Sequence, residues 1–146
     1  MRLSTKGCYG LRAMVELAKS FGGGPVLMQA IADSQKISRK YLHALLTTLR
    51  GAGLVRSVRG AGGGYVLARP PAQIKLNEVL QTLEGAITFT DCVRDKGACE
   101  RSLKCVGHDL WCEISRTVDE LLAGITLADL VVRQADLERR TEMYYI

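Results

Sequence analysis

The N-terminal part of the chain repeats apolar and polar positions with the period of an α-helix. A first helix is predicted to begin at Ser4 or Thr5, either of which can cap it, and to end at the glycines of residues 22–24. A second, shorter helix breaks around residues 33–36. Ser38 then caps a third helix, whose apolar stripe is Leu42, Leu45, Leu46 and Leu49. This order is typical of a helix-turn-helix unit, although an ordinary helical hairpin has the same spacing.

The third predicted helix carries polar side chains off its apolar stripe. In a helix-turn-helix unit, the first turns of this helix enter the major groove of DNA and offer their side chains to it. The residues that we expect to make such contacts are Ser38, Arg39, Lys40, Tyr41, His43 and Arg50, with Thr47 also off the stripe.

Two short runs with strand character, residues 54–58 and 65–67, flank a glycine-rich segment. A phosphate-binding enzyme loop is excluded because no Gly-Lys-Ser/Thr follows and the glycines lead into a strand instead of a helix. The pattern therefore predicts a hairpin wing, whose glycines let the loop lie close to a DNA backbone. Arg59 is best placed to enter a minor groove. The loop glycines and flanking cations in question are Gly60, Gly62, Arg56, Arg59 and Arg69.

Two further amphipathic helices are predicted after Pro70 and Pro71. The first, around residues 76–83, should pack against the first helix. The second, over residues 110–125, carries more apolar surface than one contact buries, so it either packs on its own domain or pairs with its twin in a twofold dimer. A capping box formed by Thr126 and Asp129 then begins a short last helix, which precedes a polar tail. The fold class predicted is mainly α, a winged helix-turn-helix domain with a two-stranded wing plus a long dimerisation helix.

The net charge of +5 hides a strong asymmetry along the chain. Residues 1–75 hold twelve Lys and Arg against two acids, whereas residues 76–146 hold eight against thirteen. A half-chain with a charge of +10 favours a polyanionic partner over a merely solvated surface. The sequence has no apolar run of about 18 residues, which argues against a membrane span. It also has no signal peptide, so a cytoplasmic location is expected.

Three of the five cysteines and one of the two histidines lie within seventeen residues: Cys92, Cys99, Cys105 and His108. The residues between them are rich in Gly, Asp, Lys and Arg and cannot form a core, so this segment needs something to fold around. The gaps are wider than the Cys-x-x-Cys turns of structural zinc sites, which disfavours zinc. Thiolates suit iron–sulfur clusters, and an imidazole among them raises a cluster's reduction potential. Disulfides are a poor default in a reducing cytosol, and redox chemistry of bare thiols is the main alternative.

The two other cysteines lie outside this segment. Cys8, near the start of the first helix, is interpreted as a small buried hydrophobe. Cys112 lies one heptad beyond Cys105, and we interpret it as a buried thiol of the long helix.

Several segments together resemble a known family. They are Met-Arg-Leu-Ser-Thr-Lys-Gly at the start, Ser-Arg-Lys-Tyr-Leu at 38–42, the wing sequence at 54–65, the three cysteines with His-Asp-Leu-Trp at 108–111, and Gly-Ile-Thr-Leu-Ala-Asp-Leu at 124–130. In this order, over nearly the whole chain, they resemble the bacterial iron–sulfur regulators typified by IscR, with NsrR and RirA as relatives. The wing and the three-cysteine segment are the specific parts of the match.

The resemblance implies a homodimeric transcription regulator with one iron–sulfur cluster per subunit, commonly 2Fe-2S. Its ligands would be Cys92, Cys99, Cys105 and His108. In the nitric-oxide-sensing relatives, a carboxylate at position 8 reaches the partner subunit's cluster, so Cys8 is an alternative fourth ligand. The recognition helix departs from IscR at Lys40, His43 and Ala44, so the operator sequence does not transfer.

We therefore expect a winged helix-turn-helix DNA-binding domain at residues 1–84 and a cluster-binding loop at 85–108. Residues 109–146 would form the dimerisation helix, the short last helix and the tail. The expected function is that of a repressor that binds double-stranded operator DNA under the control of a cluster sensing iron, cluster supply or redox stress. The alternative is a DNA-binding regulator that senses oxidants or zinc through thiols. An enzyme is not expected, because no cysteine is paired with a base in a recognisable nucleophile motif.

Overall fold

Three capped helices begin the chain in the computed structural model, which describes residues 2–145; Met1 and Ile146, the ends of the expected domains, lie outside them. Helix α1 (Thr5–Lys19) is capped by Ser4, whose Oγ accepts from the backbone N–H of Lys6. Helix α2 (Met28–Gln35) ends where Lys36 takes a left-handed conformation, φ 53°. Helix α3 (Arg39–Gly51) is capped by Ser38. The predicted helix-turn-helix order is confirmed.

The predicted wing is an antiparallel hairpin of β1 (Val55–Val58) and β2 (Gly64–Leu67). Tyr65 exchanges two backbone hydrogen bonds with Val26, 2.8 and 2.9 Å long, so the hairpin is anchored to the segment before α2. A Cβ on Gly64 would collide with the backbone of Val26, and φ at this glycine is +153°. A Cβ on Gly63 would likewise meet the carbonyl oxygen of Val58. These two glycines therefore serve the hairpin itself, whereas a Cβ on Gly62 would meet nothing.

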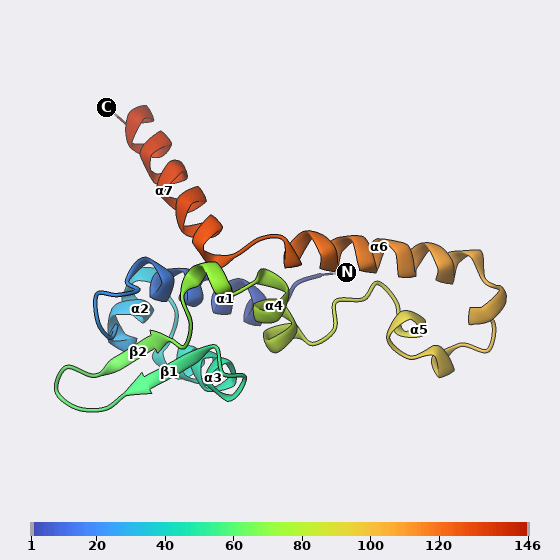
Figure 1. Ribbon diagram of the computed structural model, residues 1–146, viewed down its shortest axis with the longest axis horizontal. Helices are drawn as coiled ribbons and strands as arrows, with labels where there is room; N and C mark the ends of the chain where they lie inside the picture. The colour runs from blue at the N-terminus through green and yellow to red at the C-terminus, as the bar shows by residue number, and fades with distance from the viewer. Residues whose placement is uncertain (1, 146) are drawn as a thin grey trace.

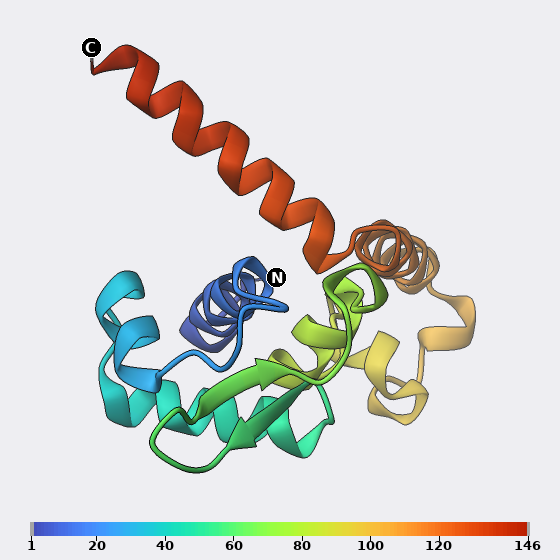
Figure 2. The same cartoon turned by 60° about the vertical axis from the view of Figure 1, so that its left-hand side comes forward.

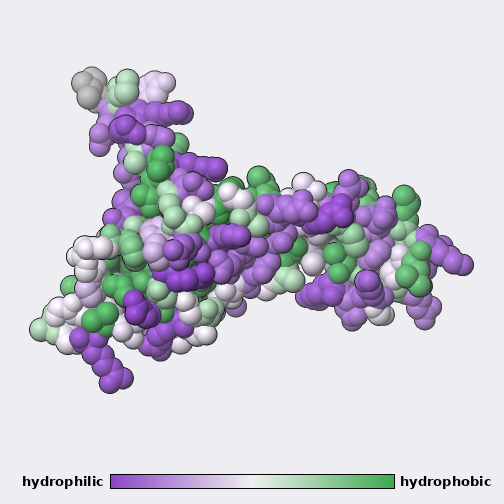
Figure 3. All heavy atoms as spheres, in the orientation of Figure 1, coloured by the Kyte–Doolittle hydropathy of each residue, from purple (hydrophilic) through white to green (hydrophobic). Residues whose placement is uncertain are grey.

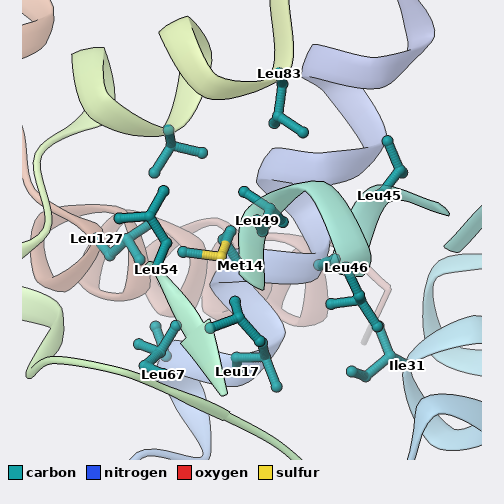
Figure 4. Close-up of a cluster of buried hydrophobic side chains, with 14 of the residues drawn as sticks. Met14, Leu17, Ile31, Leu45, Leu46, Leu49, Leu54, Leu67, Leu83 and Leu127 are labelled. Carbon is teal, nitrogen blue, oxygen red and sulfur yellow. The ribbon is translucent and has the colours of Figure 1, made fainter. Parts of the chain in front are cut away.

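A single hydrophobic core joins the helices to the wing. Met14 of α1 lies in its middle, among leucines of α3 and the strands (Figure 4). Helix α4 (Leu76–Glu84) follows the short 3-10 helix η1 (Pro71–Gln73) and adds its own apolar face. Leu127, fully buried, contributes to the same core from far along the chain. The arrangement is the predicted mainly helical fold with a two-stranded wing.

Helices α1 and α4 approach closely because α1 presents glycines to α4. A Cβ on Gly10 would meet the side chain of Leu83, and one on Gly7 would meet Glu84. The carboxylate oxygen Oε1 of Glu84 accepts from the N–H and Oγ of Ser4 (2.8 and 2.6 Å) and from the N–H of Gly7 (2.9 Å). The Ser4 hydroxyl, these backbone donors and Lys6 hold the pKa of Glu84 below its ordinary value. One carboxylate thus fastens the start of α1 to the end of α4.

The chain then leaves this winged body. A loop containing α5 (Asp91–Arg94), η2 (Lys96–Ala98) and η3 (Ser102–Lys104) runs outward, and α6 (Val106–Ala123) returns as an arm (Figure 1). The return ends in backbone hydrogen bonds from Leu76 N–H to Ile125 O (2.9 Å) and from Leu127 N–H to Ile74 O (3.0 Å). Among residues 2–145, no helix is long and apolar enough to cross a membrane.

The last helix is longer than predicted. Its capping box of Thr126 and Asp129 is present, but α7 (Leu127–Tyr144) continues through the segment expected to be a tail and projects from the body (Figure 2). Polar residues with good helix propensity extend it, supported by pairs within the helix such as Gln134 with Glu138 (2.9 Å). Lys19 of α1 also lies 3.5 Å from Glu138. The polar composition of the last residues had indicated an irregular tail, but their helix propensity is high enough to continue α7 through them.

The carboxylate of Glu84 gives a test of the α1–α4 contact. Glu84→Gln removes the charge that strengthens three hydrogen bonds, so the free energy of unfolding at pH 7 should fall by about 1 kcal/mol. Because the folded pKa is lowered, this contribution is complete above the unfolded value of about 4.3 and is lost as pH falls through the folded pKa. Urea unfolding of both proteins should therefore differ at pH 7 and converge in acid. Glu100→Gln, at an exposed loop position, is the control; an equal loss there, or a difference that persists in acid, would contradict the assignment.

Candidate functional site

The loop between α4 and α6 has almost no core of its own. From Gly85 to Cys105, Ser102 is the one residue that is buried, and its hydroxyl donates to the carbonyl oxygen of Lys96 at 3.3 Å. The loop is attached to α6 by the aromatic rings of Phe89 and Trp111, which are stacked with centroids 6.4 Å apart. A segment of about twenty residues with so little burial gains little stability from packing alone.

Cys92 and His108 meet within this segment. Sγ of Cys92 lies 3.3 Å from Nδ1 of His108 and 3.1 Å from Oγ1 of Thr90. A sulfur and a nitrogen bound tetrahedrally to one metal atom lie about 3.5 Å apart, given bond lengths of about 2.3 and 2.0 Å. The observed separation of 3.3 Å between Sγ of Cys92 and Nδ1 of His108 is close to this distance. Since His108 lies in the first turn of α6, this contact brings the loop to the start of the arm.

The remaining two predicted ligands do not join this pair. Cys99 is half-buried, Cys105 is exposed, and both are free thiols. Across residues 2–145, no three Cys, His, Asp or Glu side chains lie close enough together to hold one metal ion. A two-iron cluster takes its protein ligands in pairs, one pair at each iron, so its four ligands need not converge on one point. The donors fit a thiolate–imidazole centre in chemical kind, and Cys92 with His108 also fit in spacing.

Gly107 leaves space beside Cys105. The position that a Cβ would occupy there lies 3.5 Å from Sγ of Cys105 and 3.5 Å from Nε1 of Trp111. Both distances correspond to ordinary van der Waals contact, so Gly107 lies directly beside the Cys105 thiol and the Trp111 ring at the start of α6.

The two extra cysteines differ from their predicted placement to different degrees. Cys112 is half-buried on α6, and its Sγ lies 3.5 Å from Nε2 of His108. The sequence carried a signal for this contact, because two residues four positions apart share one face of a helix. Cys8 is exposed, so its interpretation as a buried residue is wrong. The inward face of α1 runs through Gly7, Gly10 and Met14, and Cys8 lies to one side of it.

The predicted recognition helix exposes most of its candidate contacts. Arg39, Lys40, His43 and Arg50 of α3 are exposed. Tyr41 is half-buried instead: its hydroxyl lies 2.9 Å from Oγ1 of Thr5, and its ring meets Tyr9 edge-on at 6.0 Å. Ser38 accepts from the N–H of Tyr41 at 3.2 Å. Ser38 and Tyr41 therefore position the helix, while the four cationic and imidazole side chains face solvent.

The wing lies beside this helix (Figure 1). Arg50 of α3 donates to Oγ of Ser57 on β1 at 3.3 Å, a link that neither residue's local sequence indicated. Arg56, Arg59, Gly60 and Gly62 are all exposed. Arg69 is used within the body, where it pairs with Glu78 at 2.9 Å and donates to the carbonyl oxygen of Gln73. The exposed cations therefore lie on two neighbouring elements, α3 and the hairpin, whereas Arg69 is held within the body.

Comparison with known proteins identifies a family whose model matches most of the chain. The model of the Rrf2 family, described as an iron-dependent transcriptional regulator, matches residues 3–133. The HTH-type transcriptional regulator CymR of Bacillus subtilis is 41% identical over 146 residues, which cover 100% of both chains. The family and this relative are transcriptional regulators, not enzymes.

Two solved structures are similar over most of the chain. T. potens IscR superposes with a TM-score of 0.76 and 41% identity, covering 92% of this chain and 88% of that one. CymR, the global cysteine regulator of B. subtilis, gives a TM-score of 0.77 and 41% identity, covering 91% of this chain and 98% of that one. These likenesses match the winged helix fold described above.

Proposed function

This chain belongs to the Rrf2 family of iron-dependent transcriptional regulators, and from that premise we propose that it is a homodimeric repressor controlled by an iron–sulfur cluster. The cluster, 2Fe-2S and one per subunit, is held by Cys92, Cys99, Cys105 and His108, with Cys8 of a partner as the alternative to His108. It senses iron, cluster supply or redox stress, and the protein acts in the cytoplasm on double-stranded operator DNA.

The contact between Cys92 and His108 is the observation that carries this proposal. It joins a loop without a core to the first turn of α6, at a separation suited to a shared metal atom. A bound cluster would supply iron and redox sensitivity at this junction. The four side chains would then hold the loop against α6, replacing the packing that the loop lacks.

A change in the ordering of the loop can affect the proposed DNA-binding surface, because packed helices connect the two. α6 contacts α4, where Nε2 of Gln81 donates to Oδ1 of Asp119 at 2.8 Å. α4 in turn packs on α1 and α3. Holding or freeing the start of α6 therefore biases the pose of the winged body, and couplings of this kind are typically worth ~1–3 kcal/mol.

DNA contact is assigned to α3 and the wing. In this assignment α3 lies in the major groove and the loop follows the adjacent backbone. His43 reaches a base edge, whereas Arg59 contacts phosphate or the minor groove. The full set of proposed contacts is Ser38, Arg39, Lys40, Tyr41, His43, Arg50, Arg56, Arg59, Gly60 and Gly62, with Ser38 and Tyr41 contributing from the helix start.

The exposed face of α6 supports the dimer. Leu110 and Leu121 remain 46% and 64% exposed, and eleven positions bring them within about 20° of each other around the helix. Val106, 86% exposed, extends the same face toward the loop. Hydrophobic atoms are visible at the surface of this arm (Figure 3). A second copy of α6 would cover such a face with twofold symmetry.

A regulator that uses bare thiols is the second candidate. Its support is the row of contacts from Cys92 through His108 to Cys112, which needs no bound group, and the 41% identity to CymR, whose structure is titled a cysteine regulator. Zinc remains a variant of this alternative, disfavoured by the wide cysteine spacing.

Anaerobic purification distinguishes the two candidates. The protein should be brown, with iron and acid-labile sulfide in equal amounts, and its operator affinity should change on cluster removal by roughly 5–150-fold. Reconstituted His108→Ala should differ from the parent in visible spectrum and reduction potential, whereas Cys8→Ser should not. Colourless protein with one zinc per chain would favour the second candidate. A spectrum changed by Cys8→Ser alone would move the fourth ligand to Cys8.

Arg59 tests the wing. Arg59→Ala should weaken operator binding, measured by fluorescence anisotropy, and lower the slope of log affinity against log salt by roughly one if the contact is to phosphate. Arg140→Ala makes the same charge change on exposed α7 and is the matched control. Equal effects from the two substitutions would remove the wing from the interface.

Leu121 tests the dimer. Because its side chain is exposed in one subunit, Leu121→Glu should leave the thermal unfolding of the winged body nearly unchanged while placing a charge in the dimer contact. Sedimentation should show a monomer at concentrations where the parent is a dimer, and operator affinity should fall because only one half-site is engaged. Leu103→Glu, at a leucine that is 93% exposed and outside α6, is the control. A dimeric Leu121→Glu protein would reject this interface.

A further inference from the structure

The imidazole of His108 lies between two thiols. Nδ1 is 3.3 Å from Sγ of Cys92, and Nε2 is 3.5 Å from Sγ of Cys112. Cys112 follows His108 by four positions on α6, so its side chain stands on the same helix face. Both residues are half-buried, which limits competition from water. Among residues 2–145, no carboxylate or carbonyl oxygen hydrogen-bonds either ring nitrogen.

The two ring nitrogens have different neighbours in the proposed site. Nδ1 faces Cys92, which is itself a proposed ligand. The distance from Nδ1 to Sγ of Cys92 is close to the roughly 3.5 Å expected between a nitrogen and a sulfur bound to one tetrahedral metal atom. An imidazole that ligates through one nitrogen normally donates the N–H of the other to an outer partner, which fixes the tautomer and the ring orientation. On this face of α6, the group available to Nε2 is the Cys112 sulfur, a weak acceptor.

We infer that Cys112 is a positioning residue: it accepts the Nε2–H of His108 and so leaves Nδ1 unprotonated and aimed at the metal side of Cys92. This inference rests on the proposed function, because it takes Cys92 and His108 as ligands of the cluster. It assigns Cys112, which the predicted ligand set left out, to the support of that set. It also assigns the ligating atom of His108 as Nδ1.

Retention of the cluster tests this role with a conservative pair of substitutions. Cys112→Ala removes the acceptor, and the reconstituted variant should hold its iron about 10–100-fold more weakly against a chelator, the usual cost of losing an outer partner. Cys112→Ser keeps an oxygen that can accept the same N–H and should stay near the parent. Ser115→Ala is the matched control on α6, because the buried Ser115 hydroxyl has no hydrogen-bond partner in the described chain. It should behave as the parent does.

A second measurement does not need the cluster. The chain has two histidines, so nitrogen-15 NMR of the metal-free protein resolves both rings, with the exposed His43 as an internal reference. In the parent, His108 should be protonated on Nε2 and bare on Nδ1, more completely than His43. Cys112→Ala should bring His108 toward the tautomer mixture of His43, while Cys112→Ser should not.

Several outcomes would overturn the inference. Protonation of His108 on Nδ1, a tautomer unaffected by Cys112→Ala, or unchanged iron retention in that variant would each do so. Loss of the cluster from Cys112→Ser to the same extent as from Cys112→Ala would show that the thiol itself is a ligand. A parent that binds no cluster would instead refute the proposed function, and the NMR comparison would still decide whether Cys112 orients His108.

Discussion

The close contact between α1 and α4 determines where the rest of the molecule lies. It exists because Gly7 and Gly10 present no side chain to α4, and because Glu84 satisfies donors at the start of α1. α4 also packs on α3 and α6, so one helix connects α3 with the arm. A Cβ added at Gly10 would collide with the side chain of Leu83, and one added at Gly7 would collide with the carboxylate of Glu84, so either would disturb this contact just before Gly85.

The loop between α4 and α6 differs from the winged body in having almost no packed interior. The winged body is held together by a core rich in buried leucines, whereas the loop has one buried residue between Gly85 and Cys105. Its stability must therefore come from side chains that bind something, or it will be low. Low local stability is what a switch requires, because a ligand can only shift an equilibrium between states that are close in free energy. In the proposed function, the body therefore supplies the stability of the fold and the loop supplies the sensing.

The elements that could be predicted from the sequence are those specified locally. Ser4, Ser38 and the Thr126–Asp129 box each cap a helix through neighbours within three residues. The bond between Ser4 and Glu84 spans eighty positions, and no local pattern encodes it. The exposure of Cys8 follows from which face of α1 meets α4, which depends on that same long-range contact. Composition and spacing predicted four ligands, but spacing along an irregular loop does not determine which donors meet, and of the four the structure brings Cys92 and His108 together.

In the proposed function, the position of His108 explains how a weakly packed loop acts on the winged body. His108 lies in α6, which ends at Ala123, and shortly beyond that end Thr126 forms an antiparallel bridge with Lys75, directly before α4. Backbone hydrogen bonds from Leu76 N–H to Ile125 O and from Leu127 N–H to Ile74 O lie beside this bridge. A displacement of the start of α6 at His108 would therefore be transmitted along the helix to the body at its other end. Packed helices move between discrete arrangements, because close-packed interiors deform little, so a small shift at His108 can select one pose of α4 over another. A ligand at position 8 would act on α1 directly, by a shorter route. Of the two candidates proposed for the fourth ligand, His108 is the one that lies on α6, so the proposed route through the arm depends on His108.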